Sequence, residues 1–182
     1  MRLAILADTH VPERADELPA PFKSHIKEAD HTVHAGDFET IEFHQEISEL
    51  ANELTAVHGN ADPAPLDRPA VAEVTIEGIT FVVTHGTINP VEAAVFGHDA
   101  VVFTGEEWAN AIADTARART RAWDGQDIVG IGGHTHRVED TTHDGVRILN
   151  PGSATGADPA QAATMMTVEV DGTEFDVTLH EE

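Results

Sequence analysis

Short apolar runs rich in β-branched residues alternate with helical patterns along the chain. The expected strands are Arg2–Ala7, Thr32–Ala35, Leu54–Val57, Val71–Ile76, Thr80–Thr84, Asp127–Ile131, Val138–Thr142, Val146–Leu149, Thr164–Val170 and Glu174–Leu179. Helices are expected at Ala20–Ala29, Thr40–Asn52 and Glu106–Ala122, and the ambiguous segment Val91–Thr104 allows an extra helix and strand. Turn signals at Glu77-Gly78 and Asp171-Gly172 indicate hairpins and argue against a purely parallel sheet. We therefore predict an α/β fold: one domain, residues 1–182, forming a four-layer α/β/β/α sandwich of two mixed β-sheets flanked by helices.

Polar residues follow six of these apolar runs. They are Asp8-Thr9-His10, Gly36-Asp37, Gly59-Asn60, His85-Gly86, His134-Thr135-His136 and Asn150-Pro151-Gly152-Ser153. Ligands of open α/β sheets bind beyond the carboxyl ends of the strands. If those ends lie together, the polar groups converge on one patch.

The patch would contain two aspartates, one asparagine and four histidines. Residues two apart in an extended segment point the same way, so Asp8 and His10, or His134 and His136, can hold one metal. A mixed nitrogen and oxygen set suits manganese, iron, nickel, cobalt or zinc better than calcium. Seven ligands exceed one tetrahedral site but suit two metals that share a carboxylate and activate a bridging water.

The five patterns Asp8-x-His10, Gly36-Asp37, Gly59-Asn60, His85 and Gly133-His134-x-His136 resemble, in that order, the motifs of the calcineurin-like metallophosphoesterases. The short chain and the Asn150–Ser153 tail resemble the small single-domain phosphodiesterase branch of that family. The resemblance implies a metal on Asp8, His10 and His136, a second on Asn60, His85 and His134, and Asp37 as the bridge. It also implies that Asp37, Asn60 and His85 are catalytic, and that the nucleophile is a metal-bridging hydroxide.

The chain departs from the family pattern at Ala61, where many relatives carry a histidine that protonates the leaving group. Asp62 keeps the family's acidic position, with either a supporting role at the site or a turn-forming role. Relatives often place a basic residue soon after Asn-Pro-Gly-Ser, whereas residues 154–163 contain none. The Asn150–Ser153 segment is therefore either a rim of the site or a structural turn.

Several other residues allow two interpretations. His34 and His58 precede expected ligands and either support them or line the core. His98 is expected on the surface or in a lid, while Arg117, Arg119 and Arg121 are expected at a solvated helix end. Residues 87–105 follow His85 and are expected to shape substrate access.

The net charge of −23 comes from 33 acidic and 10 basic residues. Because 41% of the residues are hydrophobic, we expect an acidic shell around a folded core rather than a disordered chain. Such a shell repels duplex nucleic acid. It is typical of a halophilic cytoplasm, where about 1 M salt shortens the Debye length to roughly 3 Å. The alternative is an ordinary acidic protein that is poor in lysine.

The chain contains no cysteine, which excludes disulfide scaffolds, thiolate metal sites and cysteine nucleophiles. Asp8 interrupts the only apolar run near the N-terminus, so no signal peptide is expected, and no run approaches the length of a membrane span. We expect a cytoplasmic protein that does not bind membranes and could form a homo-oligomer.

The leading functional hypothesis is a two-metal phosphoesterase, specifically a phosphodiesterase that acts on a small phosphate ester. Manganese is the expected metal, with nickel, iron, cobalt or zinc as alternatives. One alternative hypothesis is a non-catalytic metal-binding scaffold for protein assembly, which the missing acid at Ala61 favours. Another is a nuclease that acts on short oligonucleotides.

Overall fold

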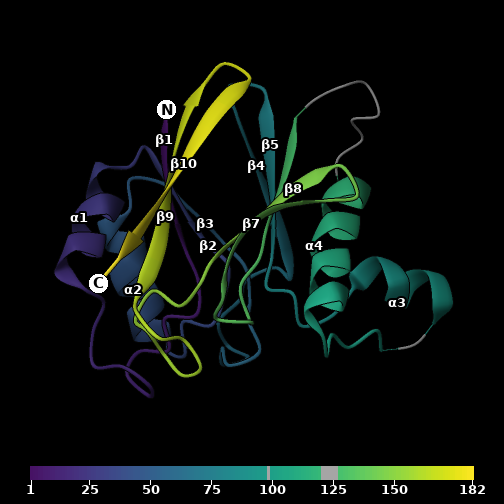
Figure 1. Cartoon of the computed structure of the whole chain (residues 1–182). Coiled ribbons are helices and arrows are strands. Elements are labelled where there is room, and N and C mark those ends of the chain that lie inside the picture. The colour runs from purple at the N-terminus through teal and green to yellow at the C-terminus, as the bar shows by residue number, and fades with distance from the viewer. Residues whose placement is uncertain (98, 120–126) are drawn as a thin grey trace.

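The computed structural model of the chain describes residues 1–97, 99–119 and 127–182 (Figure 1). Its helices are α1 (Ala20–Glu28), α2 (Ile41–Leu50), α3 (Pro90–Phe96) and α4 (Gly105–Arg119). Its strands are β1 (Arg2–Leu6), β2 (His31–His34), β3 (Leu54–Ala56), β4 (Val71–Ile76), β5 (Ile79–Thr84), β6 (Ile128–Ile131), β7 (Val138–His143), β8 (Val146–Pro151), β9 (Thr164–Asp171) and β10 (Glu174–Glu181). All ten expected strands are thus present, with ends displaced by two residues or fewer.

The strands form two five-stranded mixed sheets, with the orders β10-β9-β1-β2-β3 and β4-β5-β6-β8-β7. Each sheet contains three parallel strands: β1, β2 and β3 in the first, and β5, β6 and β8 in the second. The remaining strands join through antiparallel pairs, as the hairpin signals predicted. The six parallel strands are the six apolar runs that polar residues follow in the sequence.

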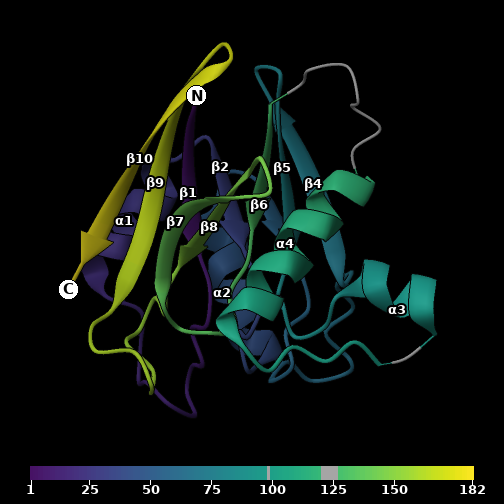
Figure 2. The same ribbon diagram turned by 45° about the vertical axis from the view of Figure 1, so that its right-hand side comes forward.

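Three buried apolar layers hold the sheets and helices together. Leu3 and Ile5 of β1 lie between the two sheets, while Ala4 and Leu6 point to the opposite face, toward α1 and α2. This alternation follows from the two-residue period of a strand, and it explains why β1 is apolar throughout. In the second sheet Val82 and Ile148 pack against α4. Figure 2 shows α1 and α2 beside the first sheet and α4 beside the second, which confirms the predicted four-layer sandwich.

The helices agree with the sequence patterns at most positions. Thr40 precedes α2, and its hydroxyl accepts a hydrogen bond from the Phe43 amide. The ambiguous segment Val91–Thr104 contains all of α3 except Pro90, whereas its expected strand is reduced to a single bridge between Ile88 and Val101. The stripe Trp108, Ile112 and Ala116 on α4 is buried, as predicted. The end expected for that helix, beyond Arg119, lies outside the described residues.

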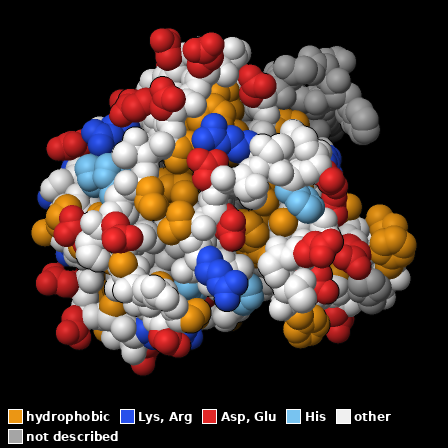
Figure 3. Space-filling view, viewed as in Figure 1, with side chains coloured by type: hydrophobic (Ala, Val, Ile, Leu, Met, Phe, Trp, Pro, Cys, Tyr) orange, Lys and Arg blue, Asp and Glu red, His pale blue; other side chains and the backbone are white. Residues whose placement is uncertain are grey.

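The carboxyl ends of the six parallel strands lie at one edge of the sandwich, at the bottom of Figure 1. Figure 3 shows acidic side chains spread over much of the visible face, with few basic ones among them. Within the described ranges, no helix has both the length and the apolar character needed to cross a membrane.

Candidate metal centre

The structure brings all seven expected ligands to this edge. Asp8 and His10 follow β1, Asp37 follows β2 and Asn60 follows β3, while His85 follows β5 and His134 and His136 follow β6. Nε2 of His10 lies 3.2 Å from Nε2 of His136. The Asn60 Oδ1 atom lies 3.1 Å from Nε2 of His85 and 3.0 Å from Nδ1 of His134. The expected convergence of strand ends therefore occurs.

Most of these residues have an unusual backbone conformation. Five of them have positive φ angles although they are not glycine: Asp8 (51°), His10 (48°), Asp37 (63°), His134 (68°) and His136 (56°). A side chain makes this left-handed region unfavourable by about 1–2 kcal/mol per residue. Such strain gathers at functional sites, where the surrounding structure holds it in place. Its concentration here indicates that the loops are shaped to aim these side chains.

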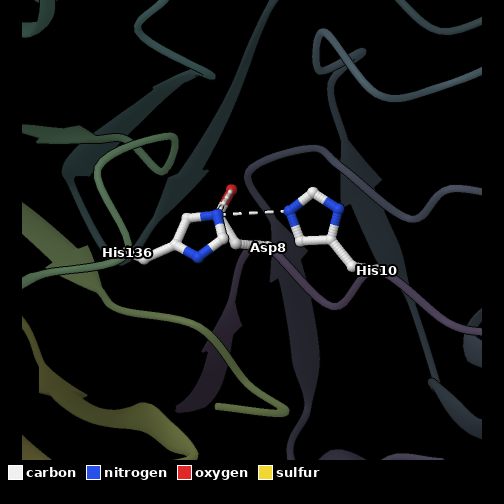
Figure 4. A group of neighbouring side chains, drawn as sticks. All are labelled: Asp8, His10 and His136. Carbon is white, nitrogen blue, oxygen red and sulfur yellow. Dashed lines mark hydrogen bonds and ion pairs between the residues drawn. The ribbon is translucent and has the colours of Figure 1, made fainter. Parts of the chain in front are cut away.

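Asp8, His10 and His136 form a buried group, and their ligand atoms all lie within 4.8 Å of one another (Figure 4). Nδ1 of His10 lies 2.6 Å from the Glu39 carboxylate, and Nδ1 of His136 lies 2.9 Å from the Ala157 carbonyl. A carbonyl oxygen only accepts, so Nδ1 of His136 carries the proton, and its Nε2 atom is left as a bare nitrogen. The Glu39 carboxylate likewise accepts a hydrogen bond from Nδ1 of His10, which leaves Nε2 of His10 available as a ligand.

Asn60, His85 and His134 form an outer group. Nδ1 of His85 donates to the Ala35 carbonyl at 2.8 Å, so the Nε2 atom is the ring nitrogen that faces Asn60. His85 is buried, His134 is half-buried and Asn60 is exposed. The ligand atoms of His85, Asp8 and Asp37 also lie within 4.8 Å of one another.

Asp37 lies between the two groups. Its Oδ2 atom is 3.5 Å from Nε2 of His10 in the buried group and 3.3 Å from Nε2 of His85 in the outer group. Its Oδ1 atom accepts a hydrogen bond from the Ala61 amide at 2.7 Å. The position suits a carboxylate shared by two cations.

The carboxylates and His85 strongly perturb one another. Burial raises the pKa of Asp8 to about 7. Burial also opposes the charge on Asp37, but the hydrogen bond and the charge of His85 outweigh it and lower the pKa of Asp37 to about 2. Burial likewise opposes a charged His85, but the hydrogen bond to Asp37 and the charges of both aspartates raise its pKa to about 9. Burial lowers the pKa of His134 and His136, which keeps them neutral.

Two observations fit a metal cation at this centre. The Oδ2 atom of Asp8 is buried and has no hydrogen-bond partner among the described residues. Nε2 atoms of His10 and His136 face each other at 3.2 Å, and two bare nitrogen lone pairs repel at that distance unless a cation or proton lies beside them. A divalent cation satisfies both the carboxylate oxygen and the two nitrogens. The mixed nitrogen and oxygen donors match the first-row transition metals.

Asp62 joins the loops that follow β2 and β3. Its Oδ2 atom accepts hydrogen bonds from the amides of Asp37 at 3.1 Å and Gly59 at 2.8 Å. Its Oδ1 atom accepts from the amides of Phe38 at 2.6 Å and Glu39 at 3.0 Å. Asp62 therefore combines both roles considered for it, because it builds a turn and thereby places Asp37.

Gly59 is required by a close approach. A Cβ atom at this position would lie 2.1 Å from the Oδ1 atom of Asp37 and 2.4 Å from its amide nitrogen. No side chain can be accommodated without moving the carboxylate.

The Asn150–Ser153 segment supports the loops that carry the candidate ligands through hydrogen bonds to their backbone. The Asn150 side-chain amide donates to the Gly133 carbonyl at 3.0 Å, and the Ser153 hydroxyl donates to the Asp8 carbonyl at 2.7 Å. Trp108 of α4 also donates to the Gly133 carbonyl, at 3.0 Å. These contacts hold the β1 and β6 loops in place.

Glu39 was not foreseen from the sequence. Its carboxylate orients His10, and its own φ angle is 83°. Its place two residues after Asp37, in a loop that begins with glycine, is the signal that could have identified it.

The remaining candidates differ in their surroundings. His34 is buried, stacks on Phe38 with ring centroids 3.6 Å apart, and lies 3.3 Å from the Thr9 hydroxyl, so it supports the Asp8 loop. His58 is half-buried after β3. Arg117 and Arg119 pair with surface acids, as expected for a solvated helix end. His98 and Arg121 lie outside the described residues.

A sandwich of two mixed sheets with histidines and carboxylates at its strand ends defines a class of metal-binding α/β proteins. The family model of the calcineurin-like phosphoesterase superfamily domain matches residues 1–173, so the chain belongs to this family. Its resemblance to that family, seen in the sequence motifs, is thereby confirmed.

The chain is also similar to individual proteins and solved structures. A probable metallophosphoesterase of Methanothermobacter thermautotrophicus is 26% identical over 184 residues, which cover 98% of this chain and 91% of the relative. Among solved structures, a mutant Vps29 from Entamoeba histolytica has a TM-score of 0.76 at 23% identity, covering 100% of this chain and 92% of that chain. A Thermotoga maritima protein solved by NMR has a TM-score of 0.67 at 26% identity, covering 100% of this chain and 99% of that chain.

Proposed function

We propose that residues 1–182 act as one two-metal phosphodiesterase domain. The observation that carries the proposal is the Asp37 carboxylate, which lies within 3.5 Å of a ligand nitrogen in each of the two groups. Membership of the metallophosphoesterase family supports phosphate-ester hydrolysis. In this proposal Asp8, His10 and His136 hold one cation, Asn60, His85 and His134 hold the other, and Asp37 touches both. Manganese is the first candidate metal.

When bound, two divalent cations supply the charge that activates water and stabilises the phosphoryl transition state. The chain's own residues fix that charge in position. Glu39 and the Ala157 carbonyl hold the rings of His10 and His136, and the Ala35 carbonyl holds His85. The Ala61 amide and Asp62 hold the Asp37 carboxylate and its backbone. This preorganisation places the ligands before the substrate arrives.

Ala61 restricts the substrates that react well. It carries no acid, so the chain provides no proton at the position where many relatives have histidine. Leaving groups that depart readily as anions should therefore react fastest. We expect aryl diesters to be good substrates.

The test is manganese-dependent hydrolysis of bis-p-nitrophenyl phosphate in molar potassium chloride, beside the p-nitrophenyl monoester. We expect turnover of the diester, and a loss of at least about 10³-fold in Asp37→Asn and in His85→Ala. Asp140→Asn is the matched control, because this acid pairs with Arg147 on the surface. Unchanged activity in both site variants would refute the assignment.

A non-catalytic scaffold is the second candidate, and the absent acid at Ala61 is the observation that favours it. Folded protein that binds manganese but hydrolyses neither ester would support the scaffold. The proposed enzyme works in a salt-rich cytoplasm on a small phosphate ester. Loss of the folded state at low salt would support the salt-rich setting, and full stability there would contradict it.

A further inference from the structure

A cavity of about 370 Å³ opens beside the outer group. His134 and Thr135 of the loop after β6 line this cavity, so it adjoins the candidate centre at His134. The other walls come from residues 102–105, from α4 and from β7. Its volume lies within the range of small-molecule sites, about 300–1,000 Å³.

One wall of this cavity is aromatic. Phe103 has 83% of its surface exposed, although it is a large apolar side chain. Trp108, which is buried, also lines the cavity. An exposed phenylalanine that lines a cavity offers a flat face on which a ring can stack.

Other residues that line the cavity are polar, and one of them is a cation. Four other arginines of the described part of the chain form ion pairs with carboxylates: Arg2, Arg117, Arg119 and Arg147. Within the described ranges no such pair involves Arg137, which lines the cavity and follows His136 directly. An unpaired arginine in a chain with a net charge of −23 is available to donate hydrogen bonds to a ligand.

The mixture of groups discriminates between ligands. Glu139 and Thr141 line the same cavity and can accept hydrogen bonds from a ring N–H. A simple alkyl chain would desolvate these polar groups without pairing them, which is costly. A heteroaromatic ring can stack on Phe103, accept from Arg137 and donate to Glu139 at the same time.

We propose that this cavity binds the nucleoside part of a nucleoside phosphodiester while the phosphorus lies at the metal centre. Phe103 and Arg137 are its specificity-determining residues. The inference rests on the proposed phosphodiesterase function and names the substrate class of that site.

Two substrates with the same leaving group test the proposal: the p-nitrophenyl ester of thymidine 5′-phosphate and methyl p-nitrophenyl phosphate. We expect wild-type kcat/KM to be at least about tenfold higher for the thymidine ester, because stacking one base contributes about 1–3 kcal/mol. In Phe103→Ala and Arg137→Met we expect this preference to fall about tenfold, mainly through KM. Hydrolysis of the methyl ester should fall less than that of the thymidine ester, because the methyl ester has no base to stack.

Val95→Ala and Arg119→Met are matched controls. Val95 is an exposed apolar residue of α3 and Arg119 pairs with Glu73 on the outer surface, and neither lines the cavity. Both variants should keep the wild-type preference. Equal losses with both substrates, or no preference in the wild-type enzyme, would overturn the nucleoside assignment while leaving the phosphodiesterase proposal intact.

Binding of thymidine 5′-phosphate, measured by calorimetry with and without manganese, separates the two proposals. If neither ester is hydrolysed but the nucleotide binds wild type and not Phe103→Ala, the cavity assignment holds and the phosphodiesterase proposal fails. If no binding is detected to any variant, the cavity assignment fails.

Discussion

The buried group and the outer group differ in how the protein encloses them. Asp8, His10 and His136 are all buried, and the rings of the two histidines are each held at Nδ1. In the outer group only His85 is buried, while His134 is half-buried and Asn60 is exposed. The cavity lined by Phe103 and Arg137 opens beside His134.

This difference separates two tasks within one site. A buried group with fixed rings is suited to keep a cation, because solvent does not compete for its ligands. An outer group beside a cavity is suited to admit substrate. Variants that disturb the element common to both groups should therefore cost most, and variants of supporting residues should cost less.

Gly59→Ala should have the largest effect. The new Cβ atom would lie 2.1 Å from the Asp37 Oδ1 atom, so the carboxylate common to both groups must move. We expect a fall of at least about 10³-fold in manganese-dependent diester hydrolysis, because catalysis needs the ligands within fractions of an ångström. Gly105→Ala is the control for metal content, since a Cβ there meets nothing within 4 Å. Normal metal content and activity in Gly59→Ala would show that Asp37 is not the shared ligand.

The second-largest effect is expected in the pH dependence of metal binding, which depends on the protonation of His85. Without metal, the pKa of His85 is about 9 and that of Asp8 about 7, while that of Asp37 is about 2. Between pH 7 and 9 a cation must displace the His85 proton, so the affinity should rise by about tenfold per pH unit. Below pH 7 the Asp8 proton must leave as well, which steepens the dependence.

Calorimetry of manganese binding in two buffers with different ionisation enthalpies measures this proton release directly. At pH 8 we expect about one proton per protein in wild type and much less in His85→Gln. An affinity that is constant from pH 7 to 9 would show that metal binding displaces no proton from His85.

Glu39→Gln should weaken metal binding at the buried group and leave the outer group near its wild-type affinity. The neutral amide keeps the size of the side chain but removes the charge that orients His10 at 2.6 Å. Losing such a partner typically costs about 10–100-fold in metal affinity. Glu49→Gln, an exposed acid on α2, is the control. Titration with manganese should show one weakened site and one site near its wild-type affinity; two unchanged sites would remove Glu39 from the centre.

The sequence predicted the strands well, and it placed the seven candidate ligands at the strand ends, because both depend on local patterns. Apolar runs that end in Asp8, Asp37 or His85 locate the strand ends, and the parallel order brings those ends together. The role of Asp62 in holding the Asp37 loop could not be predicted in the same way. Three of its four amide partners lie 23–25 residues away in the chain, and only Gly59 is in its own turn.

Other features depend on tertiary contacts with no local signature. Glu39 orients His10 across a separation of 29 residues, and the Asn150–Ser153 segment supports Asp8 across 145. The cavity beside His134 combines residues from the 102–105 segment, α4 and β7, which no single motif brings together. Sequence patterns therefore located the candidate ligands, and the folded structure was needed to find what holds and surrounds them.

Trp108→Phe should have the smallest effect and tests the support of the outer group. The substitution keeps an aromatic ring in the α4 layer but removes the hydrogen bond from the indole N–H to the Gly133 carbonyl. Because the Asn150 side chain donates to the same carbonyl at 3.0 Å, the group stays partly satisfied. We expect a loss of about 1 kcal/mol in the free energy of unfolding, measured by circular dichroism in urea.

The double variant Trp108→Phe/Asn150→Ala leaves that buried carbonyl without either donor. Its loss of stability should exceed the sum of the two single losses, because each single variant keeps one hydrogen bond to Gly133. Diester hydrolysis should fall further in the double variant than in either single one, since the Gly133 loop carries His134. Strictly additive losses would mean that the two donors do not act on the outer group through this carbonyl.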